Sequence, residues 1–138
     1  MKVYAWRRNL NEPAAGDAGH DIVLWNDVWI MPKSHKTIYT GIHLRLPEGT
    51  VGFVKARSSA GNRGVAVLGG VIDESYIGEL KVMLYNTSWL PRRWRVGQRI
   101  TQLVIVPVIT PGIEWVPGPA YLGETDRGEK GFGERTGR

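Results

Sequence analysis

A carboxylate at position 73 stands in the segment of the chain that is richest in groups able to do chemistry. Residues 69–80 read Gly-Gly-Val-Ile-Asp-Glu-Ser-Tyr-Ile-Gly-Glu-Leu, a pattern that predicts a β-hairpin. Asp73 follows two β-branched residues that we expect to be buried, so its position would be fixed and its approach restricted, as a general base requires. Tyr76, three residues later, is placed to cover a planar or ring-shaped ligand. A plainer interpretation is that Asp73 caps the turn and Tyr76 packs on the surface.

Three further clusters carry charged or hydroxyl groups. Arg57-Ser58-Ser59-Ala60-Gly61 follows a predicted strand, and a guanidinium with two hydroxyls on a glycine-containing turn can cradle a phosphate or a carboxylate. Arg92-Arg93-Trp94-Arg95 has the composition of a nucleic-acid patch with a stacking aromatic, although we favour a solvated hairpin loop here. Ala18-Gly19-His20-Asp21 opens a strand with a carboxylate, for which turn capping is the default role.

The composition excludes several kinds of chemistry. The 138 residues include no cysteine, which rules out disulfides, thiolate nucleophiles and cysteine-ligated metal sites. The three histidines, His20, His35 and His43, share no metal-ligand spacing, and we assign none of them a role. The net charge of +5 favours polyanionic partners, such as nucleic acid, an acidic membrane or a phosphorylated small molecule, without choosing among them.

These groups must be positioned by a fold in which long helices have no room. The chain holds 18 glycines and 8 prolines, and no stretch free of both exceeds 12 residues. Short alternating runs recur between the turn signals, which indicates an all-β sandwich, barrel or jelly roll. The β-branched run at 100–108 predicts a strand buried on both faces, and a single helical turn fits at 58–63. We expect further strands at 42–46, 51–57 and 80–85, with weaker candidates at 2–6, 21–25, 36–40 and 113–116.

The end of the chain differs from the rest. Residues 123–138 contain five glycines, eight charged residues and one large apolar side chain, Phe132. Such a segment buries too little apolar surface to offset the entropy of ordering it. We therefore expect a β-rich domain over residues 1–122 and a flexible glycine-rich C-terminal arm over 123–138. On composition alone, the arm is a solubilising tail.

Taken in order along the chain, these pieces resemble the five motifs of the homotrimeric dUTPase family. Asp73 and Tyr76 stand in the third and most specific motif, Gly70-Val71-Ile72-Asp73-Glu74-Ser75-Tyr76-Ile77-Gly78-Glu79. The other four resemblances are Ala18-Gly19-His20-Asp21-Ile22, Arg57-Ser58-Ser59, Gly97-Gln98-Arg99-Ile100-Thr101-Gln102-Leu103 and Arg127-Gly128-Glu129-Lys130-Gly131-Phe132-Gly133. The match spans residues 18–133, nearly the whole chain.

This resemblance implies a fold, a reaction and an assembly. The family's subunit is a jelly-roll-like all-β fold with a flexible C-terminal arm, in agreement with the expected strands. Its members hydrolyse dUTP to dUMP and pyrophosphate with Mg²⁺, and each of the three active sites in the homotrimer draws on all three chains. We therefore expect a dUTP diphosphatase in which water attacks the α-phosphorus in line.

The resemblance also implies roles for individual residues. Asp73 would hold and deprotonate the attacking water, and Asp21 would act near the Mg²⁺ indirectly, through water or a phosphate-site contact. The residues expected to contact the phosphates are Arg57, Ser58, Ser59, Gln102 and Arg127. The residues expected to recognise the nucleoside are Gly70, Val71, Ile72, Tyr76, Lys81 and Phe132. Among these, Tyr76 would lie against the deoxyribose and Phe132 would close over the base.

The sequence departs from the family's fifth motif in one place, and three rival functions stay open. After Gly-Phe-Gly that motif usually continues Ser-Thr-Gly, whereas this chain continues Glu134-Arg135-Thr136-Gly137, which brings a carboxylate near the expected phosphates. A dCTP deaminase shares the fold and the Arg-Ser-Ser element, but its catalytic Glu would fall near Met83. A non-catalytic nucleotide-binding regulatory module is the second rival. The third is a basic nucleic-acid-binding barrel, which rests on residues 92–95 alone.

The expected partners and location follow from the same residues and resemblance. We expect dUTP as the substrate and two further copies of the chain in a homotrimer, with no nucleic acid and no membrane as partners. No apolar run approaches the ~20 residues that cross a membrane. The first residues lack the apolar block of a signal peptide, so we expect a cytoplasmic protein.

Overall fold

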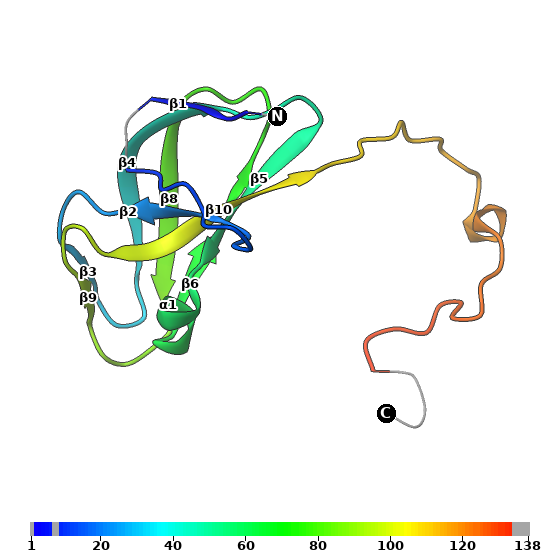
Figure 1. Cartoon of the computed structure of the whole chain (residues 1–138). Helices are drawn as coiled ribbons and strands as arrows, with labels where there is room; N and C mark the ends of the chain where they lie inside the picture. The colour runs from blue at the N-terminus through cyan, green and yellow to red at the C-terminus, as the bar shows by residue number, and fades with distance from the viewer. Residues whose placement is uncertain (1, 7–8, 134–138) are drawn as a thin grey trace.

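Antiparallel strands are the main regular elements of the structure, a computed structural model that describes residues 2–6 and 9–133 (Figure 1). The strands are β1 (Tyr4–Trp6), β2 (His20–Val23), β3 (Val28–Ile30), β4 (His35–Arg45), β5 (Thr50–Ala56), β6 (Val65–Leu68), β7 (Val71–Ile72), β8 (Glu79–Asn86), β9 (Arg92–Trp94) and β10 (Arg99–Pro107). The helices are α1 (Ser58–Asn62), which occupies the expected helical turn, and the 3-10 helix η1 (Pro119–Leu122). The all-β prediction is confirmed.

The strands form two larger sheets and one small ribbon. One sheet has the strand order β1-β4-β8-β6, the second has the order β2-β10-β5-β7, and β3 pairs with β9 separately. All these pairings are antiparallel. One hydrophobic core joins side chains from both larger sheets and from the ribbon. Its fully buried large side chains include Ile30, Ile42, Leu80, Leu84, Ile100 and Leu103.

Period-two alternation identified the central strands correctly. In β8, Leu80, Val82 and Leu84 are buried while Lys81 and Met83 point outward. The expected strands at 36–40 and 42–46 merge into the single strand β4, whose pairing with β8 shifts register between Tyr39 and His43. Alternation therefore sets which face of each strand meets the core, because successive side chains point to opposite faces of a sheet.

Strand β10 is less buried than its composition predicted. It pairs with β5 along most of its length, but its pairing with β2 ends at Leu103. Val104, Ile105 and Val106 are only half-buried. The prediction of burial on both faces is wrong for this part of the strand, which lies at the edge of its sheet with side chains that keep contact with solvent.

The segment 69–80 joins the two larger sheets and does not form the predicted hairpin. β7 pairs with β5, through Gly52 with Ile72 and Phe53 with Val71, whereas β8 pairs with β4 and β6. Gly70 makes the crossing possible: its φ is +94°, and a Cβ there would lie 2.8 Å from the carbonyl oxygen of Val54. The expectation that Val71 is buried is also wrong, since its side chain is 60% exposed.

The ribbon β3–β9 lies where we favoured a solvated loop. Its outward and inward positions alternate, so that Trp94 is 5% exposed between the exposed residues Arg93 and Arg95. Val28 and Ile30 on β3 are buried in the same way. The loop prediction is wrong because a single inward-facing tryptophan is enough to attach this basic stretch to the core.

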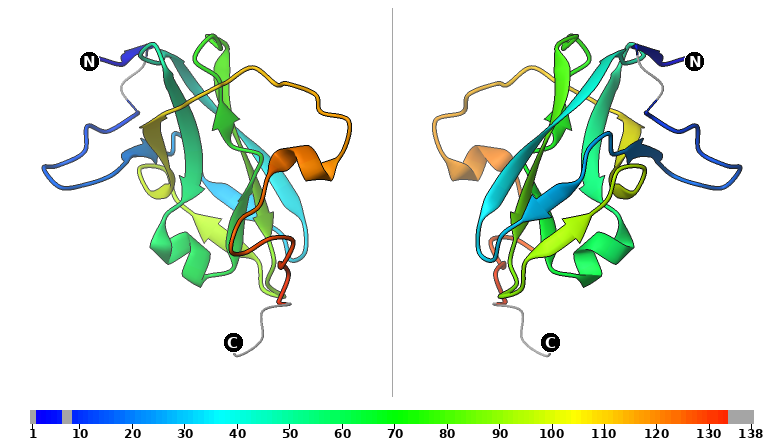
Figure 2. Two further views of the ribbon diagram at one scale, coloured as in Figure 1. Left: turned by 90° about the vertical axis from the view of Figure 1, so that its right-hand side faces the viewer. Right: turned by 90° about the vertical axis from the view of Figure 1, so that its left-hand side faces the viewer.

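The chain leaves the strand core after β10. Residues 108–118 contain no strand, so the weak strand candidate at 113–116 is wrong, and Ile109 and Trp115 are more than four-fifths exposed. Figures 1 and 2 show this segment and the residues after η1 running outside the two sheets. The division at residue 122 between domain and arm stays a prediction. Among the described residues, none of the helices has the length and apolar character needed to cross a membrane.

Candidate active site

Three neighbouring strands bring polar side chains to one face of the second sheet. Asp21 on β2 is the register partner of Gln102 on β10, and Gln102 is in turn the partner of Lys55 on β5. Residues directly opposite one another in a sheet point to the same face. Arg57 follows β5 and Arg99 begins β10, so two guanidinium groups come from the same three strands.

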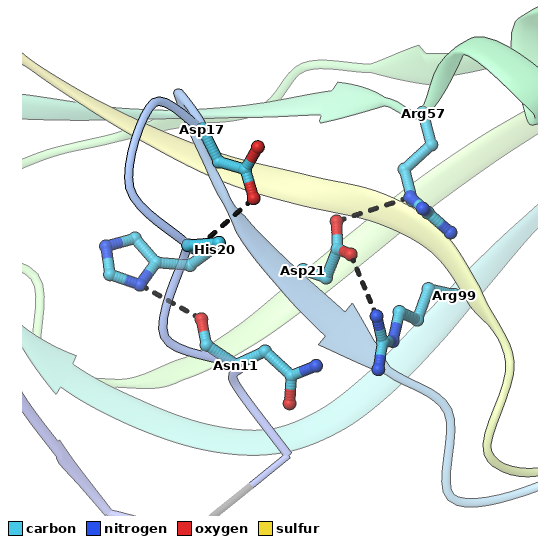
Figure 3. Close-up of polar contacts among 7 residues, drawn as sticks. Asn11, Asp17, His20, Asp21, Arg57 and Arg99 are labelled. Carbon is cyan, nitrogen blue, oxygen red and sulfur yellow. Dashed lines mark hydrogen bonds and ion pairs between the residues drawn. The ribbon is translucent and has the colours of Figure 1, made fainter.

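The Asp21 carboxylate lies between these two guanidinium groups (Figure 3). Its Oδ1 is 3.3 Å from Nε of Arg57, and its Oδ2 is 3.3 Å from Nη1 of Arg99. Asp21 is only 21% exposed and the arginines are about two-fifths exposed, so the cluster is open on one side. Arg99 belongs to the fourth motif but was not among the predicted site residues, and its partner stands 78 residues earlier in the chain.

An open pocket of about 440 Å³ adjoins this ion pair. Its lining residues are Asp17, Ala18, Gly19, Asp21, Arg57, Ser58, Ser59 and Gln102. Gly19 makes room for the Gln102 side chain, because a Cβ at position 19 would lie 2.6 Å from Oε1 of Gln102. The structure thus brings together five residues predicted for one site: Asp21, Arg57, Ser58, Ser59 and Gln102. Guanidinium, hydroxyl and amide groups on one pocket suit an anion with several oxygens, and we call it the anion pocket.

A second, smaller pocket lies beside the turn that follows β7. It measures about 190 Å³ and is lined by Val71, Ile72, Asp73, Tyr76, Glu79 and Lys81, of which all but Glu79 were predicted as site residues. The backbone N–H of Tyr76 donates to the carbonyl oxygen of Asp73 at 3.1 Å, which closes the turn. The hydroxyl of Tyr76 donates to the carbonyl oxygen of Glu79 at 2.8 Å. Tyr76 is therefore held at its backbone and at its ring hydroxyl, beside Asp73.

Glycine at position 78 allows the Tyr76 ring to lie in this place. A Cβ on residue 78 would fall within 2.5–2.8 Å of three atoms of the Tyr76 side chain, including its hydroxyl oxygen. The Glu79 side chain is used elsewhere, as its Oε1 accepts from the backbone N–H of Gly41 at 2.9 Å. The side chain of Lys81 projects outward from β8, with its Nζ 5.4 Å from the centre of the Tyr39 ring.

Asp73 is more open than the sequence suggested. It is exposed, and within residues 2–6 and 9–133 no side chain or backbone donor bonds its carboxylate. The restricted approach that we expected from buried neighbours is absent in the single chain, because Val71 is exposed and Ile72 is half-buried. What fixes Asp73 is the backbone turn rather than apolar walls.

A single chain does not bring the two pockets together. β7 pairs with the beginning of β5 at Gly52, whereas Arg57 follows the other end of β5. The five steps from Gly52 to Arg57 span roughly 17 Å of strand, at about 3.3 Å per residue. The anion pocket and the Asp73 pocket are therefore separate sites on one subunit.

The predicted arm residues lie away from both pockets. Nε of Arg127 donates to the carbonyl oxygen of Lys130 at 2.7 Å, within a local turn, and Phe132 is fully exposed with φ +50°. Neither residue lines the two pockets. The departure at Glu134 and Arg135 lies outside the described residues.

The residues near the anion pocket fit a Mg²⁺ ion held mainly by a ligand's phosphates. In the part of the chain that the structure describes, no three His, Cys, Asp or Glu side chains gather as a metal cage. Mg²⁺ is often bound by one or two carboxylates together with phosphates and water. Asp21 is one such carboxylate beside the pocket, and both its oxygens already face arginines, so a contact through water suits it better than direct coordination.

The two-sheet fold with a polar anion pocket places this protein among the jelly-roll-like, all-β nucleotide-binding proteins. The dUTPase family model matches residues 8–136, and the chain belongs to the dUTPase family. It is 40% identical over 119 residues to the deoxyuridine 5′-triphosphate nucleotidohydrolase of Paramecium bursaria Chlorella virus 1, covering 86% of this chain and 82% of the relative. It is 39% identical over 122 residues to the enzyme of that name from Cutibacterium acnes, covering 86% and 78%.

Solved structures agree with this assignment. The dUTPase of Staphylococcus bacteriophage 80alpha with dUPNHPP superposes with a TM-score of 0.86 at 26% identity, covering 97% of this chain and 98% of that chain. The native dUTPase of EIAV superposes with a TM-score of 0.78 at 27% identity, covering 84% and 98%. The jelly-roll-like fold predicted from the motifs is confirmed.

Proposed function

We propose that this protein hydrolyses dUTP to dUMP and pyrophosphate, by attack of water on the α-phosphorus. The observation that carries the proposal is the pocket built from Asp21, Arg57, Ser58, Ser59 and Gln102, in a chain of the dUTPase family. Relatives that match most of the chain are named deoxyuridine 5′-triphosphate nucleotidohydrolases. A structurally similar phage dUTPase is known with dUPNHPP, which indicates the same class of nucleotide.

The anion pocket supplies the charge neutralisation that triphosphate hydrolysis needs. Arg57 donates from a planar fork and Ser58, Ser59 and Gln102 add neutral donors, so several phosphate oxygens can be bound at once. Asp21 acts as a positioning residue for Arg57, since its ion pair fixes the guanidinium before the nucleotide arrives. Asp21 would hold a Mg²⁺ ion through water, and the ion would supply positive charge that offsets the charge of the phosphates.

Asp73 is the general base in this proposal. Its carboxylate carries no bond to any described donor and so is free to accept a proton from water. The turn that ends at Tyr76 fixes its backbone, and the pocket beside it is large enough for part of a nucleoside. The attacking water would lie between Asp73 and the α-phosphorus.

The edge strand β7 suits recognition of a uracil. β7 is the last strand of its sheet and pairs only with β5 among the described strands, so its other edge presents free backbone donors and acceptors. Gly70, Val71 and Ile72 would bind the edge of the base as a neighbouring strand would, and cytosine would leave these groups unpaired. Tyr76 would pack on the deoxyribose and exclude a 2′-hydroxyl, with Lys81 nearby.

We also propose a homotrimer in which each site combines several chains. The roughly 17 Å of strand between the two pockets on one subunit is too long for one triphosphate to place its α-phosphorus beside both. Two copies of the chain can supply one pocket each to the same nucleotide. A third copy would supply the arm, with Phe132 closing over the base and Arg127 reaching a phosphate.

The proposal is tested by assaying pyrophosphate release with dUTP, dCTP, dTTP and UTP, each with and without Mg²⁺. We expect release from dUTP in the presence of Mg²⁺ and little from the others. Ammonia release from dCTP would instead indicate a deaminase, which the outward-facing Met83 at the expected place of its catalytic Glu argues against. Binding of dUTP without turnover would indicate a regulatory module. The cytoplasmic location stays a prediction.

A further inference from the structure

One end of the molecule, formed by the ribbon β3–β9 and its loops, carries exposed tryptophans among cations. We define this ribbon surface by Trp29, Lys33, Trp89, Arg93 and Arg95. Both tryptophans are about half exposed or more, Lys33 and Arg93 lie over their rings, and Arg95 is an exposed cation next to β9. Figure 1 shows the ribbon on the side of the molecule opposite to the tail that follows β10. None of these five residues lines the anion pocket or the Asp73 pocket.

Trp29 and Arg93 form the first half of the ribbon surface. They are register partners on the outward face of the ribbon, and the guanidinium carbon of Arg93 lies over the Trp29 ring, 5.0 Å from its centre. Trp29 is still 48% exposed. Nη2 of Arg93 also donates to Oδ2 of Asp27 at 2.9 Å, and the backbone N–H of Val96 donates to Oδ1 of the same carboxylate. Both bonds lower the pKa of Asp27 below its usual value, the bond from Val96 more than the bond from Arg93.

Lys33 and Trp89 form the second half. Nζ of Lys33 lies over the Trp89 ring, 4.5 Å from its centre, and also donates to the carbonyl oxygen of Thr87. Trp89 is 81% exposed. The buried side chain of Asn86 donates to the carbonyl oxygens of Ile30 and Leu90, which holds the two loops together. The second ring is therefore presented by a fixed loop.

The ribbon surface is continuous with the helix that follows Arg57. The guanidinium carbon of Arg63 lies 4.4 Å from the centre of the buried Trp94 ring, and Nε of Arg92 donates to the carbonyl oxygen of Arg63 at 2.9 Å. Arg57 and Arg99 belong to the ion pairs of Asp21 at the anion pocket and are left out of this end. The segments 25–36, 58–64 and 86–98, which build it, hold six Lys or Arg and one acidic residue, Asp27. The whole chain has 18 basic and 13 acidic residues, so this end carries as much net positive charge as the complete protein.

We propose that the ribbon surface binds single-stranded nucleic acid, independently of the nucleotide site. Each exposed indole has a cation over one face, which leaves another face for a base to stack on while the cation contacts the neighbouring phosphate. A duplex hides its bases from such rings. The sequence alone led us to expect no nucleic-acid partner, because residues 92–95 fitted a solvated hairpin loop better. In the fold the one tryptophan of that stretch, Trp94, is buried. The folded ribbon adds Trp29 and Trp89 from other segments.

The experiment is fluorescence anisotropy of labelled single strands with the full-length protein. Oligothymidylate and oligouridylate of about 20 nucleotides separate DNA from RNA, and a duplex of equal length is the control for charge alone. Titrations between about 50 and about 200 mM salt give the slope of log K against log salt, which we expect to be about −2 to −3 if three or four cations contact phosphates. Saturating dUPNHPP should leave the binding unchanged.

Matched variants separate stacking from charge. Trp29→Ala with Trp89→Ala should weaken single-strand binding by about tenfold or more, because stacking is lost at two rings. Arg93→Gln with Arg95→Gln should reduce the salt slope by about 1.4, at about 0.7 for each cation removed. Trp115→Ala in the tail and Arg45→Gln at the other end of β4 are exposed controls that should bind as the parent does. Turnover of dUTP by the ribbon variants should stay at the parent level, which shows that they are folded.

Four results of the binding titrations would overturn the proposal, and a fifth would reassign the surface. These are no single-strand binding at about 50 mM salt, equal affinity of the ribbon variants and the parent, displacement of the oligonucleotide by dUPNHPP, and preference for a duplex. Tighter binding to anionic vesicles or to an acidic peptide than to either single strand would also overturn it and would assign the surface to that partner.

Discussion

Oδ2 of Asp21 lies 3.3 Å from Nη1 of Arg99, while the other carboxylate oxygen of Asp21 pairs with Arg57. One carboxylate thus positions two guanidinium groups, that of Arg99 at the start of β10 and that of Arg57 just after the end of β5. The pair is partly exposed, so its contribution to folding is small, about 1 kcal/mol or less. The main effect of the ion pair with Arg57 is to fix the orientation of that guanidinium at the anion pocket.

We expect Asp21→Asn to lower kcat/KM for dUTP by on the order of 10- to 100-fold, because Arg57 loses its fixed orientation. The melting temperature should change little. If Asp21 also holds Mg²⁺ through water, the Mg²⁺ concentration for half-maximal turnover should rise in Asp21→Asn and not in Arg99→Gln. The measurement is a set of Mg²⁺ titrations of pyrophosphate release by both variants. Unchanged kcat/KM in Asp21→Asn would remove this residue from the site.

The sequence predicted those parts of the fold in which one face of a strand is apolar. It predicted those parts of the site whose residues are close together in the chain. β4 and β8 follow from alternating residues, and Ser58 and Ser59 lie beside Arg57 in the chain. The ion pair of Arg99 was not predictable, since it depends on the register of two strands 78 residues apart. The ribbon was missed because β3 and β9 have three residues each, too few to show a period.

Asp73 provides the most direct test of the chemistry. Asp73→Asn keeps the shape of the side chain but removes its ability to accept a proton, so turnover should fall on the order of 10²–10⁴-fold while nucleotide binding is retained. The neighbouring Glu74 is a matched control, because its Oε2 is already engaged by the backbone N–H of Gly49 at 2.8 Å. Glu74→Gln should retain most turnover. Single-turnover assays and calorimetric titration with dUPNHPP separate the two effects. Near-parent turnover by Asp73→Asn would refute the role of this residue.

Tyr76 should set the preference for deoxyribose through its ring and not through its hydroxyl. Tyr76→Phe loses the hydrogen bond to the Glu79 carbonyl oxygen, which costs about 1 kcal/mol in the stability of the turn. This variant should keep the discrimination between dUTP and UTP, because the ring is still present. Tyr76→Ala removes the ring and should narrow the ratio of kcat/KM for dUTP to that for UTP. Comparison of both ratios with the parent is the measurement. Equal ratios in Tyr76→Ala and the parent would assign sugar selection to another group.

The composite site predicts that two inactive variants restore activity when they share a trimer. Asp73→Asn removes the base from one pocket and Arg57→Gln weakens the other, and these pockets come from different chains in the proposed assembly. Mixed trimers formed by joint refolding should regain about a quarter of parent turnover, because about one site in four receives both intact pockets by chance. Light scattering should give three times the 15.4 kDa of one chain. An active monomer, or mixed trimers no more active than the separate variants, would exclude a shared site.

The arm should control turnover without contributing to the stability of the strand core. Removal of residues 124–138 deletes Arg127 and Phe132, neither of which lines a pocket or joins the core in the single chain. The melting temperature and the trimer should therefore be unchanged. A bound base offers Phe132 a stacking partner worth about 1–3 kcal/mol, and the phosphates offer Arg127 a charge-assisted one. Closure of the arm over the nucleotide would exclude water and fix the triphosphate in a reactive pose.

Turnover should accordingly fall by a larger factor than nucleotide affinity when the arm is removed. Phe132→Ala in the full chain is the matched control, because it removes the ring and leaves the glycines and charges of the arm in place. Its turnover should lie between that of the parent and that of the truncated protein. The measurements are kcat and the dissociation constant for dUPNHPP, taken for all three proteins at the same Mg²⁺ concentration. Equal kcat in the truncated protein and the parent would show that the arm is a solvated tail, as its composition alone indicates.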